Sequence, residues 1–529
     1  MAQIRYRANL SAKDFVFASQ NWGRSIILKQ YDQNFSRQIV SPTDPDKDIG
    51  IPQIFYAHNV MPAAQGFQSV GFNNVFPGPA GIGVGDAFQV LPWESTTNNN
   101  RGYVLFTFTS SNLTQATFDV WSITVGYSTN WVHQGQVTMP LASKGVKFTC
   151  ALVGGTSYYY VPSTGCYSFD GATWSPVTLT GLTASQIGGI TASFGYMIAW
   201  SQSAIAWSST VSPTDFTPSL ITGAGGGSVQ ALKGAITNVA HHTFGFIVFS
   251  QLNCVAAVYS GNTRYPFNYR EIIGGGGLSA PYQLIDLDSE SGNLYGYTTA
   301  GLQIISVTQA QPVFPEVTNF LGGSRFEDFN DTTLQFLETD VGIGKLNKQL
   351  QVIANRYLVL SYGIVTSFPQ QFTHALIYDI AMKRWGKLRI THIQAFEYLD
   401  QANAIQNNAR NSLAFLDPNG QIFQADFSQL ATTGGTILLG KYQHARDRLI
   451  TLQQVDLEYI QNTNNVTLNV FPTFDGKTFQ SPTQLTAIDS TTNAPQYPCR
   501  ITGMNLSLCL QGQFMLDSLM LTYSSSGRR

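Results

Sequence analysis

The sequence predicts an all-β protein, a β-propeller of six or seven blades with an additional C-terminal antiparallel β domain. Three observations lead to this fold class. Apolar residues at the i, i+3, i+4 spacing of an amphipathic helix are not sustained over three turns anywhere in the chain. Short apolar strands joined by tight polar turns recur at a nearly constant interval, and the last part of the chain has longer alternating strands.

The recurring unit is a hairpin of two short strands. One hairpin is FGYMIAW (194–200) with AIAWSS (204–209), and another is FGFIVFS (244–250) with CVAAVYSG (254–261). Seven such hairpins begin near residues 103, 146, 194, 244, 293, 356 and 413, about 52 residues apart on average. Because four-stranded propeller blades repeat roughly every 40–50 residues, we expect each hairpin to form the inner half of one blade.

A ring of sheets gives this period a physical reason. A twisted four-stranded sheet cannot bury both of its faces alone, whereas a ring of such sheets buries each face on a neighbour. The glycine tracts GAGGGS (223–228) and GGGG (274–277) lie between hairpins, where glycine allows positive φ and close backbone approach. An extended series of β-sandwiches is the alternative that this pattern leaves open.

The pattern divides the chain into three parts. Residues 1–55 form an N-terminal arm and linker, which ends in the turn-dense stretch SPTDPDKDIGIP (41–52). Residues 56–435 form the propeller. Residues 436–529 form the C-terminal β domain, since its strands are longer and alternate, and the stretch ATTGGT (431–436) marks the boundary.

Composition excludes several classes of protein. Charged residues are only 11% and aromatic residues 12%, which is unlike a disordered chain. The formal net charge of −2 provides no basic field that would hold nucleic acid phosphates. The N-terminus lacks the apolar region of a signal peptide, and no run of 18 apolar residues occurs, so we expect no membrane span and folding in a cytoplasm.

The cysteines favour neither a disulfide framework nor a zinc site. Their number is odd and no C-x-x-C motif is present, so we expect reduced, mostly buried thiols. The five residues are Cys150, Cys166, Cys254, Cys499 and Cys509.

Two stretches resemble the Asp box of sialidase propellers, S-x-D-x-G-x-T-W. They are YSFDGATW (167–174) and TFDGKTF (473–479), and both are one residue shorter between Asp and Thr than that box. The arginines are scattered, so no cluster for a substrate carboxylate is evident. We therefore expect structural turns in which Asp170 and Asp475 accept backbone N–H groups, the following glycine is left-handed, and the next aromatic residue packs on the sheet.

Acidic residues gather in two short stretches, which could bind Ca²⁺ or supply paired carboxylates. IDLDSESG (285–292) places three of them on one face if extended, and TDPDKDIG (43–50) has the same spacing. An EF-hand loop beginning at either stretch would lack the glutamate at position twelve. We expect solvated turns at both places, although a structural Ca²⁺ stays open. The residues are Asp286, Asp288 and Glu290 in the first and Asp44, Asp46 and Asp48 in the second.

Other catalytic signals are missing from the sequence. His241 and His242 are adjacent in a strand-like stretch, so they should point to opposite faces and cannot share one metal. Neither a G-x-S-x-G elbow nor a Walker loop occurs. The sequence thus predicts no catalytic, cofactor-binding or metal-ligating residues, no cofactor, and no enzyme activity.

Several segments together resemble the tail nozzle proteins of short-tailed bacteriophages, also called tail tubular protein B or phage stabilisation protein. The resemblance covers most of residues 55–529 in pieces, and it lies in the order and spacing of these pieces. The segments are HNVMPAAQGFQSVGF (58–72), WSSTVSPTDFTPSLITGAGGGSVQALKGAI (207–236), YPFNYREIIGGGGLSAPY (265–282), RYLVLSYG (356–363), ALIYDIAMKRWGKL (375–388) and the closing TYSSSGRR (522–529).

This resemblance implies a structural virion protein at the portal vertex, assembled in the host cytoplasm. Six copies would form a ring below the head–tail adaptor, with tail fibres or spikes at the periphery. Genomic DNA would pass through the channel without sequence-specific binding. The low Lys and Arg content agrees with this, because each contact of such a residue with a phosphate strengthens binding to DNA, and we expect a neutral to acidic channel wall.

Two alternatives remain at this point. The first is a receptor-binding or glycan-degrading propeller protein of the phage tail. The second is an adaptor, portal or tail-tube subunit, although portals and adaptors carry long helices that the sequence does not predict.

Overall fold

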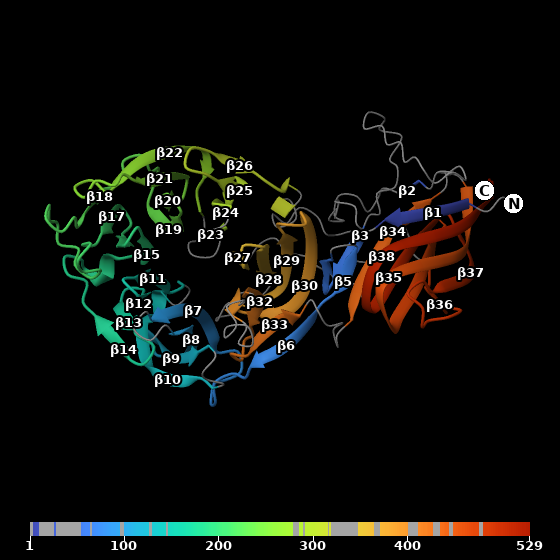
Figure 1. Cartoon of the computed structure of the whole chain (residues 1–529), viewed down its shortest axis with the longest axis horizontal. Coiled ribbons are helices and arrows are strands. Elements are labelled where there is room, and N and C mark those ends of the chain that lie inside the picture. The colour runs from blue at the N-terminus through green and yellow to red at the C-terminus, as the bar shows by residue number, and fades with distance from the viewer. Residues whose placement is uncertain are drawn as a thin grey trace.

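The structure is a computed structural model in which a ring of small β-sheets is joined at one side to a larger β-sheet (Figure 1). The named elements are strands and two short 3-10 helices, η2 (Leu141–Ser143) and η3 (Ala184–Gln186). No helix among the described residues is long and apolar enough to cross a membrane. The described residues are 4–9, 26–27, 54–63, 66–95, 100–125, 130–143, 146–278, 285–288, 291–315, 317–318, 347–363, 371–399, 411–426, 434–443, 448–474 and 480–528.

The ring is a propeller whose blades we number in chain order. Six blades are separate four-stranded antiparallel sheets, and blade 6 is a run of four antiparallel strands that shares a sheet with the C-terminal domain. Blade 1 is β7 (Ala87–Ser95), β8 (Asn100–Ser111), β9 (Gln115–Thr124) and β10 (Val132–Pro140); blade 2 is β11 (Thr149–Val153), β12 (Thr156–Val161), β13 (Gly165–Phe169) and β14 (Trp174–Val177); blade 3 is β15 (Gly189–Ser193), β16 (Tyr196–Trp200), β17 (Ala204–Trp207) and β18 (Gly225–Ser228). Blade 4 is β19 (Ile236–His242), β20 (Gly245–Ser250), β21 (Asn253–Tyr259) and β22 (Phe267–Gly276); blade 5 is β23 (Ile285–Asp288), β24 (Asn293–Thr298), β25 (Gly301–Ile305) and β26 (Ala310–Pro312); blade 6 is β27 (Asn347–Ile353), β28 (Tyr357–Gly363), β29 (Phe372–Asp379) and β30 (Arg384–His392); blade 7 is β31 (Gln394–Leu399), β32 (Asn411–Leu416), β33 (Ile422–Asp426) and β6 (Gly71–Phe76).

The first strand of each blade lies at the inside of the ring. β7, β11, β15, β19, β23, β27 and β31 contact one another in that order. Most of the hairpins expected from the sequence, such as β16 with β17 and β20 with β21, are therefore the second and third strands of their blades. The expectation that each hairpin is the inner half of its blade holds for the hairpin near 146, which is β11 with β12. It is wrong for the other six, because there the innermost strand precedes the hairpin.

The ring is closed by a strand from far away in the sequence. β6 pairs with β33 in antiparallel register, so that Phe76 lies opposite Ile422 and Gly71 opposite Asp426. Blade 7 thereby combines strands from the beginning and the end of the propeller. This pairing holds the ring closed with backbone hydrogen bonds, and β6 becomes the outermost strand of blade 7.

An apolar cluster fills each of the seven spaces between neighbouring blades. Because successive residues of a strand point to opposite faces, one strand contributes to two clusters. In β16, Ile198 and Trp200 pack toward blade 4, whereas Met197 and Ala199 pack toward blade 2. The aromatic content of the chain serves this packing: Phe106 of blade 1 meets Phe148 of blade 2 with ring centroids 4.6 Å apart. Each blade is thus buried on both faces, as the propeller prediction requires.

The C-terminal region is built on two very long strands. β35 (Arg448–Thr473) has 26 residues and β38 (Asn505–Arg528) has 24, and they pair antiparallel through several bulges. The sequence prediction of longer strands here is confirmed. The same sheet includes β34 (Gly435–Gln443), β36 (Thr483–Leu485) and β37 (Gln496–Gly503).

Strands from the N-terminal part of the chain complete this sheet. β1 (Ile4–Asn9) pairs with β38, while β2 (Ile26–Ile27) and β3 (Ile54–His58) pair with β34. Then β5 (Phe67–Ser69) pairs with β38 and with β4 (Val60–Pro62), and β4 pairs with β30 of blade 6. A single 14-stranded sheet therefore connects the propeller to the C-terminal region.

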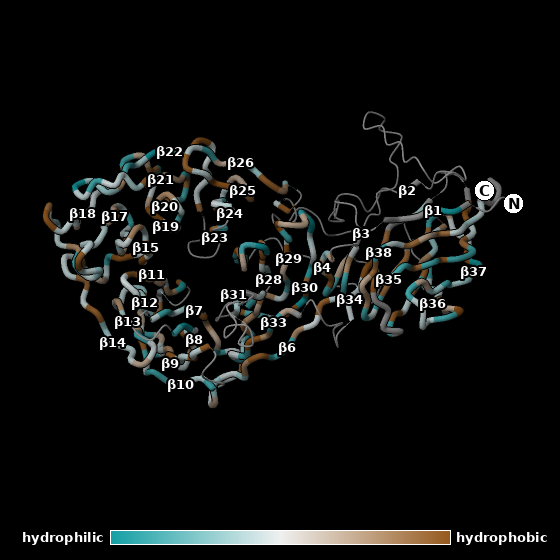
Figure 2. The backbone as a smooth tube through the Cα atoms, viewed as in Figure 1, coloured by the Kyte–Doolittle hydropathy of each residue, from teal (hydrophilic) through white to brown (hydrophobic). Residues whose placement is uncertain are grey.

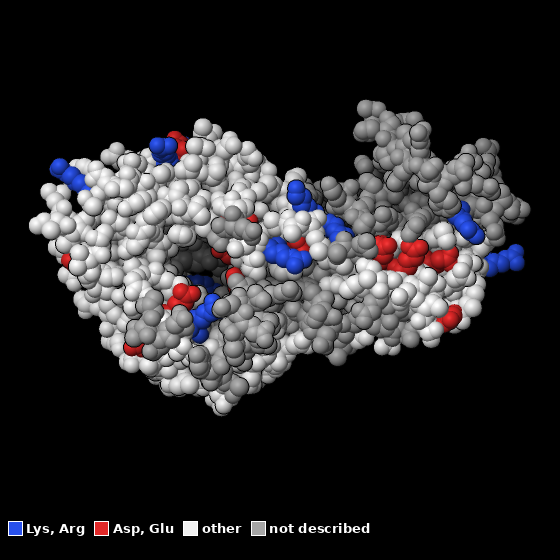
Figure 3. All heavy atoms as spheres, viewed as in Figure 1, with Lys and Arg blue, Asp and Glu red and all other residues white. Residues whose placement is uncertain are grey.

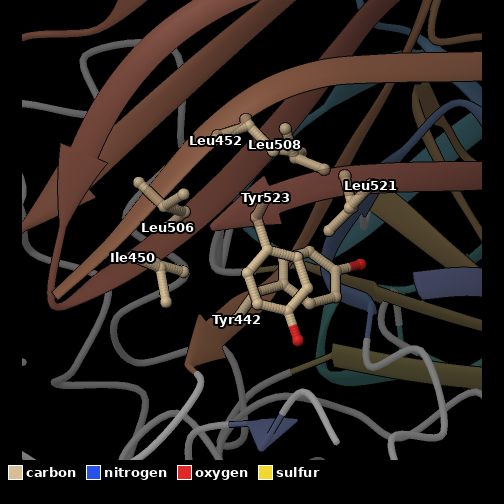
Figure 4. A pocket seen from close by; sticks show the side chains of 7 residues that line it. All are labelled: Tyr442, Ile450, Leu452, Leu506, Leu508, Leu521 and Tyr523. Carbon is tan, nitrogen blue, oxygen red and sulfur yellow. The ribbon is translucent and has the colours of Figure 1, made fainter. Parts of the chain in front are cut away.

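The interior of the C-terminal sheet is apolar and tightly packed. Figure 4 shows its core side chains, which come from β34, β35 and β38 and leave no space for a water molecule. In the hydropathy view, apolar residues are distributed both around the ring and through this sheet (Figure 2). The core side chains in Figure 4 are Tyr442, Ile450, Leu452, Leu506, Leu508, Leu521 and Tyr523.

Candidate axial site

A cavity of about 580 Å³ lies where the inner strands of the ring converge. Five blades line it, through β7, β8, β11, β23, β27 and β31. Figure 3 shows the ring hollowed at its centre, with acidic and basic groups around the opening. Its polar side chains are those of Glu94, Arg101, Asp286, Gln351, Gln394 and Glu397.

Asp286 joins blade 5 to blade 6 inside this cavity. Its Oδ2 accepts the N–H of Val352 at 2.8 Å, and its Oδ1 accepts the N–H of Leu287 at 2.9 Å. The pKa of Asp286 is raised to about 6: burial raises it most, the two backbone N–H groups lower it, and the nearby charge of Glu397 raises it. The carboxyl group is thus both a structural acceptor and a group that titrates close to neutral pH.

Glu397 has the same arrangement one blade further round the ring. Its Oε2 accepts the N–H of Ala354 at 3.3 Å, at the end of β27. Burial raises the pKa of Glu397, and both the Ala354 N–H and the charge of Arg101 lower it. The hydroxyl of Tyr103, in blade 1, donates to the backbone carbonyl of Glu397 at 2.9 Å.

Carboxamide side chains make the same kind of link between other blades. Gln394 of blade 7 accepts the N–H of Val90 at 3.1 Å and donates to its carbonyl at 3.0 Å. Gln89 of blade 1 binds Phe148 at 2.8 and 2.9 Å in the same two-point manner. Since a carboxamide both donates and accepts, it can pair with a peptide unit as a neighbouring strand would.

Two of these blade-to-blade links use an uncharged polar side chain at a buried position. A buried glutamine satisfies two backbone groups without the desolvation cost of a charge. Sequence analysis did not identify Gln89, Gln394 or Glu397. The available signal was a single polar side chain within an apolar strand, such as the glutamate in AFEYL (395–399).

The acidic stretch at 285–292 differs from the expectation of a solvated turn. Asp286 and Asp288 belong to β23, the innermost strand of blade 5, and Asp288 is only 1% exposed. Asp288 accepts the hydroxyl of Ser291 at 2.5 Å and its N–H at 3.3 Å. The expectation is therefore wrong for these two residues, because the innermost strand of a blade is shielded from solvent. Glu290, and the second stretch with Asp44, Asp46 and Asp48, lie outside the described residues.

The two adjacent histidines point apart, as predicted. His241 Nδ1 lies 2.9 Å from the carbonyl of Ala192 in blade 3, whereas His242 is buried and stacks on Phe244. Burial and, to a smaller degree, the neighbouring His241 lower the pKa of His242 to about 4. Within the described part of the chain, no group of three or more His, Cys, Asp or Glu residues could hold a metal ion.

The first Asp-Gly stretch forms the predicted turn. Asp170 Oδ1 accepts the N–H groups of Ala172 and Thr173 at 2.8 and 2.7 Å, and Gly171 has a φ of 96°. These two N–H groups also lower the pKa of Asp170. Trp174 then stacks on Tyr167 with ring centroids 5.2 Å apart. The second stretch, with Asp475 and Gly476, lies outside the described residues.

The cysteines are free thiols, as predicted. Cys166, Cys254 and Cys509 are buried, and Cys150 and Cys499 are partly buried. Burial raises the pKa of Cys150 to about 11 and that of Cys254 to about 12, so these thiols stay protonated at neutral pH.

No family model matches the chain, and no curated protein matches it. Among solved structures, a glycoside hydrolase is similar over 85% of this chain and 100% of its own, at 10% sequence identity and a TM-score of 0.23.

Proposed function

We propose that this protein is a structural subunit of the tail nozzle of a short-tailed bacteriophage. The observation that carries the proposal is the use of the polar groups around the axis. Asp286, Glu397 and Gln394 each bind the backbone of a neighbouring blade. Their hydrogen bonds therefore stabilise the ring, which is a structural and not a substrate-binding role. The resemblance of six segments, in order, to tail nozzle proteins supports the same function.

In this proposal six copies assemble below the head–tail adaptor and surround the channel through which DNA leaves the capsid. The protein is not an enzyme, and it acts through its surfaces. A rigid propeller would suit a part exposed to internal pressure, since every blade is packed on two neighbours. The joint to the C-terminal sheet supports such rigidity, because blade 6 and that sheet share both strand pairing and an apolar core.

The direct test is to determine how many copies the protein's assembly contains and where the protein lies in the virion. Mass measurement of the purified chain should give a hexamer, alone or with its adaptor, and electron microscopy of virions should place it at the portal vertex. A neutral to acidic channel wall is expected in that assembly. A strictly monomeric protein that is missing from the tail would rule the proposal out.

A glycan-degrading tail protein is the second candidate. The observation in its favour is the cavity with two carboxyl groups, Asp286 and Glu397, whose pKa values are both raised by burial. Glycosidases use a pair of carboxyl groups, of which the general acid has a raised pKa. Release of reducing sugar from host surface polysaccharide by the wild-type protein, and its loss in Glu397→Gln, would establish this function instead.

A further inference from the structure

Exposed apolar side chains gather at the end of the ring farthest from the C-terminal sheet (Figure 1). In the loop that joins β17 to β18, Val211 is 83% exposed and Ile221 is 96% exposed, and Leu220 beside it is exposed too. Figure 2 shows an apolar segment that protrudes from the rim of the ring next to these two strands. Apolar side chains that are exposed together at one place commonly mark an interaction surface.

Two neighbouring loops extend this surface. Gly223 of the first loop lies so close to the next one that a Cβ on it would be 3.2 Å from the carbonyl oxygen of Thr263, and the exposed Tyr265 follows there. Phe194, in the turn between β15 and β16, stacks on Tyr259 with ring centroids 4.3 Å apart. We call the five exposed side chains of these loops the apolar apex: Phe194, Val211, Leu220, Ile221 and Tyr265.

The backbone holds the apolar apex in place. Ser219 Oγ accepts the N–H of Ile221 at 3.2 Å, and Ser209 Oγ accepts the N–H of Val211 at 3.0 Å. Phe194 has a φ of 48° in a tight hairpin turn, where glycine, asparagine or aspartate is usual and a bulky residue is rare. The side chains are thus presented by ordered loops, so that little conformational entropy is lost when they bind.

Charge is sparse around the apolar apex, and the small excess is positive. Blades 3 and 4 with their loops, residues 189–276, contain three basic and two acidic residues. Arg264 lies directly at the apex, 5.5 Å from the ring centroid of Tyr265. Figure 3 shows that this end of the ring is mostly uncharged. Covering this surface therefore costs little desolvation of charge, and its positive excess favours an anionic partner.

Three kinds of partner can be compared on these grounds. A protein interface usually takes roughly 20–30 residues from each side, which is far more than the apex supplies. A second copy of this chain offers no groove for the apex in its two described cavities, because one has no room for a water molecule and the other is lined by charged groups. A lipid bilayer needs no matching groove, and it accepts apolar side chains with a tyrosine at the level of the headgroups.

We propose that the apolar apex binds the surface of a lipid bilayer that contains anionic lipids. Leu220 and Ile221 enter the boundary of the acyl chains, Tyr265 lies among the headgroups, and Arg264 contacts lipid phosphate. The binding is peripheral, since only loop side chains enter the bilayer. It goes beyond the proposed structural role and does not depend on it, because every residue of the apex belongs to one copy of the chain.

The test uses the purified full-length protein and vesicles of two compositions. Flotation at pH 7.5 in about 0.15 M salt compares phosphatidylcholine vesicles with vesicles that also contain about 30% phosphatidylglycerol. Binding to the anionic vesicles is expected, about fivefold tighter than to phosphatidylcholine alone. No flotation with the anionic vesicles, or complete release at about 0.5 M salt, would overturn the proposal, because insertion of apolar groups is not screened by salt. Equal binding to both vesicles would overturn the choice of an anionic surface.

Variants locate the binding. Ile221→Ser and Leu220→Ser should each weaken binding to the anionic vesicles by about tenfold, because each removes an apolar side chain that enters the bilayer. Leu113→Ser is the matched control, since Leu113 is equally exposed but lies in the turn between β8 and β9 of blade 1, and it should bind as wild type does. Circular dichroism checks that each variant is folded. Unchanged binding in both apex variants, or an equal loss in the control, would contradict the site.

Two further measurements separate lipid insertion from other contacts. The fluorescence of Ile221→Trp should shift to the blue when anionic vesicles are added, whereas that of Leu113→Trp should not, because only the first tryptophan leaves water. Mass measurement without lipid should give the same assembly for wild type and Ile221→Ser. The absence of the blue shift would overturn the proposal. A smaller assembly in Ile221→Ser would also overturn it, because the apex would then be a contact between copies of the chain.

Discussion

The propeller and the C-terminal sheet solve the same problem, burial of a β-sheet, at different distances along the chain. In the propeller, each blade is a local meander that packs on the next one, and only β6 comes from far away. In the C-terminal sheet, β38 pairs with β1 and β34 pairs with β3, so residues 4–9 lie beside residues 518–523. We expect that one blade can lose its packing while the other blades stay folded, because each blade is a local unit. The C-terminal sheet is built from strands that are distant in the sequence, so we expect it to lose its order as a whole.

Removal of a large aromatic side chain between two blades should have the largest effect on stability. Phe106 is fully buried between blades 1 and 2 and contacts Phe148 and Trp174. Phe106→Ala should lower the free energy of unfolding by about 3–5 kcal/mol, measured by denaturant titration. Hydrogen exchange should show lost protection mainly in blades 1 and 2. Leu113→Ala is the control, since Leu113 is 97% exposed and its loss should change stability little.

A cavity in the C-terminal core should spread further through the molecule. Leu508 is 1% exposed and packs among the side chains of Figure 4. Leu508→Ala should cost about 2–5 kcal/mol. Hydrogen exchange should then increase in β1 and β3 as well as in β35 and β38, because these strands form one sheet. If the loss of protection stayed within a few residues of position 508, the contrast between the two regions would be wrong.

The carboxamide hydrogen bonds between blades should contribute less to the free energy of unfolding than a core side chain does. Gln394→Ala removes both hydrogen bonds to Val90 and leaves a buried backbone N–H and carbonyl unpaired. The expected cost is about 2 kcal/mol in the free energy of unfolding. Gln421→Ala is a suitable control, because the side chain of Gln421 bonds Asn74 at an exposed position. Equal effects of the two substitutions would mean that the link between blades 7 and 1 is not important for stability.

The architecture could be predicted from the sequence, whereas the axial site could not. Repeated hairpins such as 194–209 identify blades, and Asp170 with Gly171 identifies its turn, because both depend on neighbouring residues alone. The partners of Gln394 and Asp286 could not be predicted, since they lie on other blades, and the ring decides which blades meet. The pairing of residues 4–9 with β38 was likewise not predicted. The sequence of a short strand does not indicate which strand it pairs with, and here the partner is more than 500 positions away.

A pH dependence of stability should originate in the propeller alone. The pKa of Asp286 is about 6 in the folded protein, above its ordinary value of 3.8, which applies when the chain is unfolded. The folded state therefore holds the proton more tightly, and Asp286 makes stability fall as the pH rises from about 4 to 6. Its contribution to the slope is on the order of 1 kcal/mol per pH unit in that interval.

Asp286→Asn should remove this contribution, because the amide does not titrate. The measurement is denaturant unfolding of wild type and variant at pH 4, 5, 6 and 7, with the difference between them taken at each pH. The variant loses one backbone acceptor, which lowers its stability by a constant amount and leaves the slope informative. Asp170→Asn is the control: the pKa of Asp170 is lowered, so any change in slope would have the opposite sign. The contrary result is a difference in the free energy of unfolding between wild type and Asp286→Asn that is the same at all four pH values. It would show that folding does not raise the pKa of the axial carboxyl group. The propeller axis would then not differ chemically from the C-terminal core.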